Sequence, residues 1–119
     1  MTRGVAASTP EEYLAAAPAD QSAALRTVLE HLLAALPRAE TVISNGIIVV
    51  RVAGRGVVGL SAAKSHCSLH LMSTKAAATL AGALPEGRLV GATVRFAADA
   101  PLGPVTVRTI VETRLAELP

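Results

Sequence analysis

Aromatic residues are almost absent from this chain of 119 residues, which contains one Tyr, one Phe and no Trp. Domains that bind single-stranded nucleic acids stack the bases on aromatic side chains, and this chain has too few of them. Its 11 Lys and Arg residues are scattered and the net charge is only +2, whereas proteins that bind a duplex carry a clustered basic stripe. We therefore expect no nucleic-acid partner.

The single cysteine, Cys67, cannot form a disulfide within the chain, so nothing indicates an oxidising compartment. The opening MTRGVAAS lacks the apolar segment of a signal peptide, and no later apolar run reaches the length that spans a membrane. We expect a cytoplasmic protein with no membrane partner.

The composition predicts one folded domain. Apolar residues make up 51% of the chain, which is typical of a folded rather than a disordered protein, and this length suits a single core. That core has to be built from aliphatic side chains because aromatic ones are so few. We expect a flexible segment at residues 1–8 and a single α+β domain at residues 9–119.

Helix signals are strong near the N-terminus. Thr9, Pro10 and Glu12 form a capping box with a proline at the first helical position. Pro18 begins a longer helix, which Pro37 ends. Its apolar residues recur at helical spacing: Leu25, Val28, Leu29, Leu32, Leu33 and Leu36.

The middle of the chain has the pattern of strands joined by short turns. Asn45-Gly46 is a typical hairpin turn, and a second turn is expected at residues 54–56. The expected strands are residues 47–52, 57–63, 66–72 and 93–97. Strands that follow one another through short turns form an antiparallel meander.

Two more helices are expected around the last strand. Ser73 or Thr74 caps a short Ala-rich helix that ends at Gly82, and Gly103-Pro104 opens a final amphipathic helix. The predicted fold class is therefore α+β, with an antiparallel β-meander sheet packed against N-terminal helices and a C-terminal helix.

Polar side chains alternate with apolar ones along residues 64–70. If this strand begins early, its period of two places four polar side chains on one face: Lys64, His66, Ser68 and His70. Arg95 joins them if its strand is adjacent. Such a row of donors suits an anionic or carbonyl-bearing ligand. A sheet face exposed to water shows the same alternation, so the sequence leaves both interpretations open.

The same segment does not predict a metal site. Residues four apart on a strand, such as His66 and His70, are separated by roughly 13 Å, too far for both imidazoles to bind one zinc ion. Cys67 points to the opposite face and is expected to pack in the core as a small apolar residue. No pair of carboxylates indicates general acid–base chemistry. We expect no catalytic residues and no enzyme activity.

Several segments taken together resemble the YdhG-like family of small proteins, assigned to the frataxin-like (YjbR- and CyaY-related) group. In order, they are TPEEYLAAAP, ALRTVLEHLLAALPRAETVISNG, GLSAAKSHCSLHLMS, TVRFAADAPLG and VRTIVETRLAEL. Four predicted site residues match family positions: Lys64, His66, Ser68 and Arg95. The chain departs from the family where residues 46–50 replace a Gly-Met-Pro-aromatic segment and residues 90–92 replace Ser-Lys-Gly.

The resemblance implies a compact α+β fold in which an antiparallel sheet packs against helices. By analogy with frataxins it also implies iron chaperoning through an acidic ridge on the first helix and a neighbouring strand. The acids of the first 39 residues are few: Glu11, Glu12, Asp20 and Glu30. Hard iron prefers several carboxylate oxygens. Iron is therefore a cofactor by resemblance only, and no other cofactor is expected.

The predicted function is that of a non-enzymatic cytoplasmic binding domain of the YdhG-like family, with iron chaperoning as the activity that the resemblance implies. The alternative is a self-associating or protein-interaction module without a small-molecule ligand. We expect a monomer or homodimer whose partner is a small anionic ligand or another protein.

Overall fold

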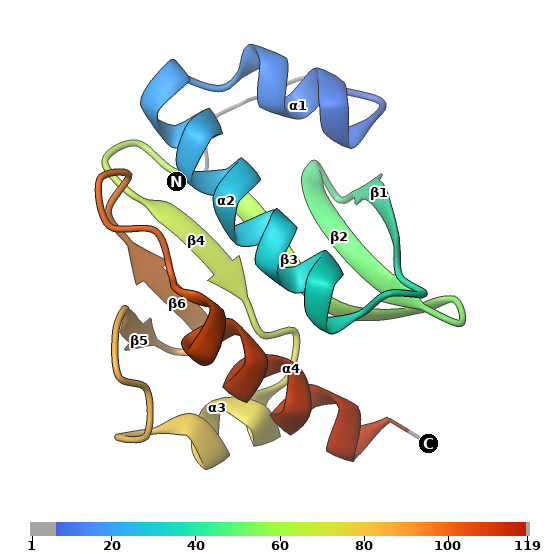
Figure 1. Cartoon of the computed structure of the whole chain (residues 1–119), viewed down its shortest axis with the longest axis vertical. Coiled ribbons are helices and arrows are strands. Elements are labelled where there is room, and N and C mark those ends of the chain that lie inside the picture. The colour runs from blue at the N-terminus through green and yellow to red at the C-terminus, as the bar shows by residue number, and fades with distance from the viewer. Residues whose placement is uncertain (1–6, 119) are drawn as a thin grey trace.

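Helices cover one face of a single antiparallel sheet in the computed structural model, which describes residues 7–118 (Figure 1). In chain order the elements are α1 (Pro10–Ala16), α2 (Ala19–Ala35), β1 (Glu40–Ser44), β2 (Ile47–Val52), β3 (Arg55–Ala62), β4 (Cys67–His70), α3 (Thr74–Leu80), β5 (Arg88–Val90), β6 (Thr93–Phe96) and α4 (Pro104–Glu117). The strand order in the sheet is β1-β2-β3-β4-β6-β5. The predicted α+β class and antiparallel sheet are confirmed. Most of the segment predicted to be flexible, residues 1–6, lies outside the described residues.

The predicted capping signals begin the short helices. Thr9 caps α1 by accepting a hydrogen bond from the Glu12 amide at 3.1 Å. The Glu12 carboxylate in turn accepts from the amide of Ser8 at 2.8 Å, one residue before the usual partner of a capping box. Ser73 caps α3 by accepting from the amide of Ala76. These bonds satisfy amides that a helix start otherwise leaves without a partner.

Two tight turns join the first three strands. The second of these turns begins one residue earlier than predicted. Asn45 and Gly46 join β1 to β2 with φ values of 52° and 78°. Ala53 and Gly54 join β2 to β3 with φ values of 53° and 77°. The predicted turn at residues 54–56 is wrong because Arg55 already pairs with β2. Positive φ at both turn residues matches the right-handed twist of a hairpin.

The core lies between the helices and the front of the sheet. Its central row crosses four strands in register, with Ile48, Leu60, Leu69 and Val94 all completely buried. Opposite them pack Leu25, Val28 and Leu32 of α2 and Val107 and Ile110 of α4. Each fully buried aliphatic side chain of this size contributes about 1.5–3 kcal/mol through the hydrophobic effect. The aliphatic core that the composition predicted is therefore the main source of stability.

A buried arginine ties α4 to the sheet. The guanidinium of Arg114 donates to the carbonyl oxygens of Val57 at 2.8 Å and Gly56 at 3.0 Å, and pairs with Glu117 at 2.9 Å. Glu117 also accepts a hydrogen bond from Ser73 at 2.6 Å. Arg114 is 6% exposed. The network joins α4, β3 and the start of α3, and thereby closes the helical side of the fold.

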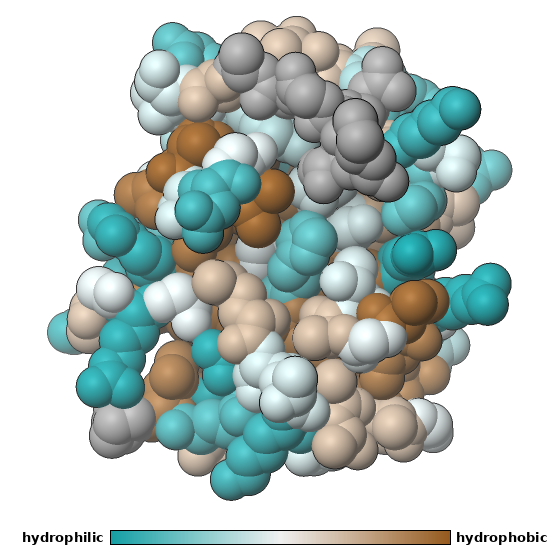
Figure 2. Space-filling model, turned by 180° about the vertical axis from the view of Figure 1, so that it is seen from behind, coloured by the Kyte–Doolittle hydropathy of each residue, from teal (hydrophilic) through white to brown (hydrophobic). Residues whose placement is uncertain are grey.

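The opposite face of the sheet, called here the back face, carries none of the helices of residues 7–118 (Figure 1). Figure 2 looks onto it and shows teal and white atoms between brown patches at the upper left and the right. Among residues 7–118, no helix is long and apolar enough to cross a membrane.

Candidate functional site

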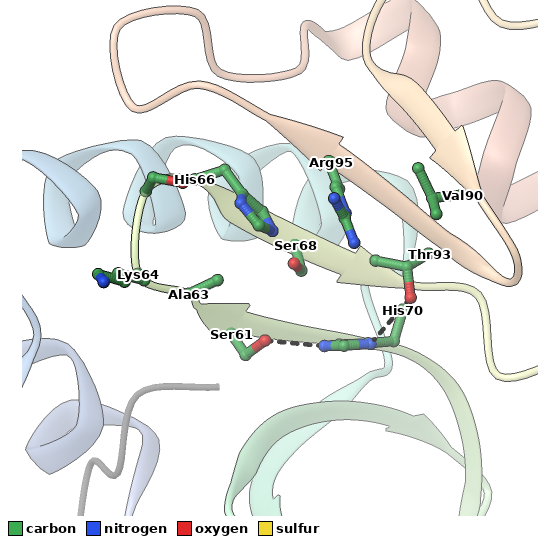
Figure 3. Close-up of a pocket in the computed structure, with 10 residues that line it drawn as sticks. Ser61, Ala63, Lys64, His66, Ser68, His70, Val90, Thr93 and Arg95 are labelled. Atoms are coloured by element: carbon green, nitrogen blue, oxygen red, sulfur yellow. Dashed lines mark hydrogen bonds between the residues drawn. The ribbon is translucent and has the colours of Figure 1, made fainter. Parts of the chain in front are cut away.

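An open cavity of about 450 Å³ lies on the back face where β3, β4 and β6 meet (Figure 3). Its lining is mostly polar and contains no acidic residue: Ser61, Ala63, Lys64, Ser65, His66, Ser68, His70, Val90, Thr93 and Arg95. All five predicted site residues are among them. The structure therefore brings the predicted residues together in one place.

Strand register arranges the back-face residues in and beside the cavity in two parallel rows. The first row runs across β3, β4, β6 and β5 through Ser61, Ser68, Arg95 and Arg88. The second row, two residues along, consists of Gly59, His70, Thr93 and Val90. Directly opposed residues of antiparallel strands project to the same face. The conditional prediction that Arg95 lies beside the β4 row is confirmed.

Lys64 and His66 do not lie on a strand, which corrects the predicted early start of β4. They belong to a bend at residues 64–66 between β3 and β4. The amide of Ala63 donates to the carbonyl oxygen of His66 at 2.8 Å and closes this bend. Both side chains still line the cavity, but a turn places them there instead of strand alternation.

The side chains differ in how they face the cavity. In Figure 3 the His66 ring and the Arg95 side chain both extend toward Ser68, whereas Lys64 points away from this group at the rim. His66, Ser68 and Arg95 therefore form the centre of the site, and we call them the central group.

Ser68 is the most unusual member of the central group. It is only 5% exposed, and its hydroxyl forms no side-chain hydrogen bond within residues 7–118, unlike the neighbouring hydroxyls of Ser61 and Thr93. Its oxygen is nevertheless not one of the fully buried unpaired atoms of the described residues, so the hydroxyl keeps contact with the open cavity. Ser68 therefore offers a hydrogen bond to whatever enters the cavity.

His70 is held by hydroxyls on both sides of its ring. Its Nε2 lies 2.8 Å from Ser61 Oγ and its Nδ1 lies 3.4 Å from Thr93 Oγ1 (Figure 3). Burial lowers the pKa of His70 because it disfavours the charged imidazolium. His70 is thus part of the cavity wall, with both ring nitrogens already engaged.

Ser61 and Thr93 are site residues that the sequence analysis missed. Ser61 pairs with Ser68 and Thr93 pairs with His70 across neighbouring strands. Each is the immediate chain neighbour of a core residue, Leu60 or Val94, and strand alternation therefore places it on the face opposite the core, a usable signal only together with the strand order.

Positive charge collects around the central group without a nearby acid. Partial burial and then the positive charge of Arg95 lower the pKa of His66. Arg88 stands directly opposite Arg95 across the β5–β6 pair, an arrangement of like charges that is unfavourable. Within residues 7–118, neither arginine nor Lys64 forms an ion pair. An anion in the cavity would relieve this repulsion.

The structure also places the residues considered for metal binding or nucleophilic chemistry. Cys67 is completely buried in the core, on the face opposite to Ser68, as predicted. Burial raises the pKa of its thiol to about 11, so the reactive thiolate is scarce near neutral pH. Glu11 pairs with Arg26 at 2.9 Å. Among the described residues, no three His, Cys, Asp or Glu side chains are grouped closely enough to hold a metal ion.

Comparisons with known proteins support the fold. No protein-family model matches the sequence, and no curated protein is significantly similar to it. The chain is similar in structure to a DUF1801-family protein, YdhG, from Bacillus subtilis, with a TM-score of 0.79 and 17% sequence identity over 90% of this chain and 88% of that chain. At this identity the likeness establishes the YdhG-like fold. It carries no link to frataxins or to iron.

Proposed function

We propose that this chain is a YdhG-like domain that binds a small anionic ligand in the back-face cavity. Ser68 carries the proposal, because it lines the cavity between two side chains that donate to anions (Figure 3) and its hydroxyl forms no side-chain hydrogen bond within residues 7–118. The fold shared with the DUF1801-family protein supports membership of the same family. Iron chaperoning has no support beyond the sequence resemblance.

The charge around the cavity favours an anion over a neutral or cationic ligand. Arg95 supplies a planar set of donors that suits carboxylate and phosphate groups, and the Ser68 hydroxyl adds a neutral donor at the floor. Lys64 lines the cavity and Arg88 stands directly opposite Arg95 on the neighbouring strand, so both add positive charge near the site. Because the cavity holds about 450 Å³, a ligand larger than a bare inorganic ion fits it.

We further propose that the site binds its ligand without transforming it. The histidine best placed to act as a base, His70, is oriented by the hydroxyl of Thr93 and not by a carboxylate, and no carboxylate lines the cavity to accept a proton. The hydroxyl that faces His70, Ser61, is 1% exposed. A hydroxyl so enclosed is poorly placed to attack a substrate.

Calorimetric titration tests the proposal with inorganic phosphate, glycerol phosphate, citrate and neutral glycerol as probes. We expect saturable binding of at least one anion, weakening as salt is added, and no binding of glycerol. Arg95→Gln should lower the affinity by about tenfold or more, because a hydrogen bond to a charged group contributes about 1.5–3 kcal/mol.

The matched control is Arg108→Gln, an exposed arginine on α4 at the helical side, which should bind as the unmodified protein does. If none of the anions binds, or if both substitutions weaken binding equally, the cavity is not the binding site.

A further inference from the structure

Gln21 is a buried polar residue on the opposite side of the sheet from the cavity. It lies in the first turn of α2 and is 5% exposed. Its side-chain amide donates to the carbonyl oxygens of Ala63 at 2.7 Å and His66 at 3.1 Å. The amide oxygen has no partner within residues 7–118. The side chain of Gln21 therefore contacts the rest of the described fold through two donated hydrogen bonds.

These two carbonyls are the two ends of the bend that carries Lys64 and His66. The amide of Ala63 already bonds to the carbonyl of His66, so Gln21 closes a small network around both ends of the bend. Immediately beyond it, the Cys67 thiol lies 3.9 Å from the backbone carbonyl of Gln21. Helix α2 thus holds the start of β4 at several adjacent points.

We propose that Gln21 is a positioning residue for the anion site, whose side-chain amide holds the bend at residues 63–66 so that the His66 ring faces Arg95 and Ser68. The proposal rests on the proposed function for the identity of the ligand. The positioning itself is a property of the protein without ligand.

The physical reason is the shortness of the bend. Four residues, 63–66, join β3 to β4, and the backbone bond from Ala63 to His66 closes them into a tight bend. Removing the Gln21 donors leaves the Ala63 carbonyl buried without this partner, so the bend gains by moving toward water. His66 moves with it and away from the positive charge of Arg95.

The substitution Gln21→Met tests the positioning directly, because Met keeps the length of the side chain and removes both donors. Nuclear magnetic resonance titration of the His66 ring, assigned with a His66→Gln sample, reports its surroundings. Among residues 7–118, the titratable or charged groups that line the cavity with that ring are Lys64 on the bend, His70 on β4 and Arg95 on β6. In the unmodified protein the pKa of His66 is lowered. In Gln21→Met we expect the pKa to rise toward its ordinary value.

Thr106→Val is the matched control for the loss of a buried polar group. Thr106 on α4 is 1% exposed and its hydroxyl has no partner among the described residues, but it does not line the cavity. We expect Thr106→Val to leave the His66 titration unchanged. A purely structural role of Gln21 would lower stability without moving that titration.

Gln21→Glu adds a test that depends on protonation. A carboxylate repels the carbonyls of Ala63 and His66, whereas a protonated carboxyl donates one hydrogen bond. We therefore compare the affinity of Gln21→Glu for inorganic phosphate with that of the unmodified protein at the same pH. The ratio of the two affinities should rise toward one as the pH falls. The same ratio for Gln21→Met should start about tenfold below one and stay flat.

The two proposals fail in different ways. A His66 titration in Gln21→Met that matches the unmodified protein overturns the positioning role, whether or not an anion binds. A shifted His66 titration together with no phosphate binding by the unmodified protein supports the positioning role and contradicts binding of phosphate at this site.

Discussion

At the scale of single residues, the environment of Ser68 is the clearest sign of a ligand. The hydroxyls of Ser61 and Thr93 beside it are both hydrogen-bonded to His70. The Ser68 hydroxyl has no such bond within residues 7–118, and Ser68 sits between His66 and Arg95 instead (Figure 3). A free donor in this position suits the anion binding that we propose for the cavity.

Ser68→Ala should therefore weaken ligand binding and leave folding almost untouched. The substitution removes no hydrogen bond of the described protein, so the free energy of unfolding should change by less than about 0.5 kcal/mol. The affinity for the anion should fall by about tenfold or more, because a donor to a charged group is lost. Paired urea unfolding and calorimetric titration measure both quantities. Equal affinity in Ser68→Ala would place the ligand elsewhere.

His70 should make stability depend on pH. Its folded-state pKa is lowered by burial from an ordinary value of 6.5, so the unfolded chain binds the proton more readily. Stability is complete above that value, falls as the pH drops toward the lower folded-state pKa, and levels off below it. Urea unfolding of the unmodified protein and His70→Gln at several pH values from about 8 to 5 measures this dependence. We expect a flatter profile for His70→Gln, and an identical profile would show that His70 is not responsible.

At the scale of elements, one of the two hairpin turns could be predicted correctly from the sequence and the other could not. Both turns have positive φ at both residues, but only Asn45-Gly46 has the residues typical of that geometry. Ala53 adopts φ of 53° without such a preference, so its turn was predicted one residue too late. Strand β5 has three residues, too few to show a periodic pattern, and was missed for that reason.

Ala53→Asn should stabilise the protein. Asparagine tolerates positive φ better than alanine and completes an Asn-Gly turn, so we expect a gain of about 0.5–1 kcal/mol in the free energy of unfolding. The reciprocal substitution Asn45→Ala should cost a similar amount. Urea unfolding of both variants tests the pair, and a loss of stability in Ala53→Asn would contradict the assigned turn geometry.

The attachment of α4 depends on Arg114 more than on any other polar residue of that helix. Arg114→Met keeps the apolar stem but leaves the Val57 and Gly56 carbonyls without their donor. We expect a loss of about 2–4 kcal/mol, since hydrogen bonds to charged groups contribute about 1.5–3 kcal/mol each. Arg108→Met, on the exposed side of the same helix, should change stability by less than about 0.5 kcal/mol. Chemical unfolding compares them, and equal effects would refute the role of the buried network.

At the scale of the whole molecule, the sheet separates the apolar core from the cavity in which we propose that an anion binds. Its front face and helices hold the aliphatic core, while its back face carries the cavity and positive charge. The period-two pattern predicted that Ser68 and His70 share a face, because strand geometry alone determines this, whereas Arg95 was placed beside them only on the condition that its strand is adjacent, which the structure meets. Gln21 was beyond sequence reasoning, since it contacts Ala63 from 42 residues away and from the other side of the sheet.

The prediction of self-association as an alternative function belongs to this scale as well. Both edge strands, β1 and β5, are short, and β1 carries a cross-strand pair between Arg51 and Glu40 at 2.9 Å. Charged side chains on short edges oppose pairing with a second sheet. These features oppose self-association through the sheet edges, while protein interaction through other surfaces stays a prediction.

The most direct test of the account is a nuclear magnetic resonance titration of the isotope-labelled protein with inorganic phosphate, followed through the backbone amides. The account predicts saturable shifts concentrated on the bend at residues 63–66, on Ser68 and on Arg95, all on the back face. Shifts that do not saturate, or that concentrate on the helical side of the sheet, would contradict an anion site in the cavity.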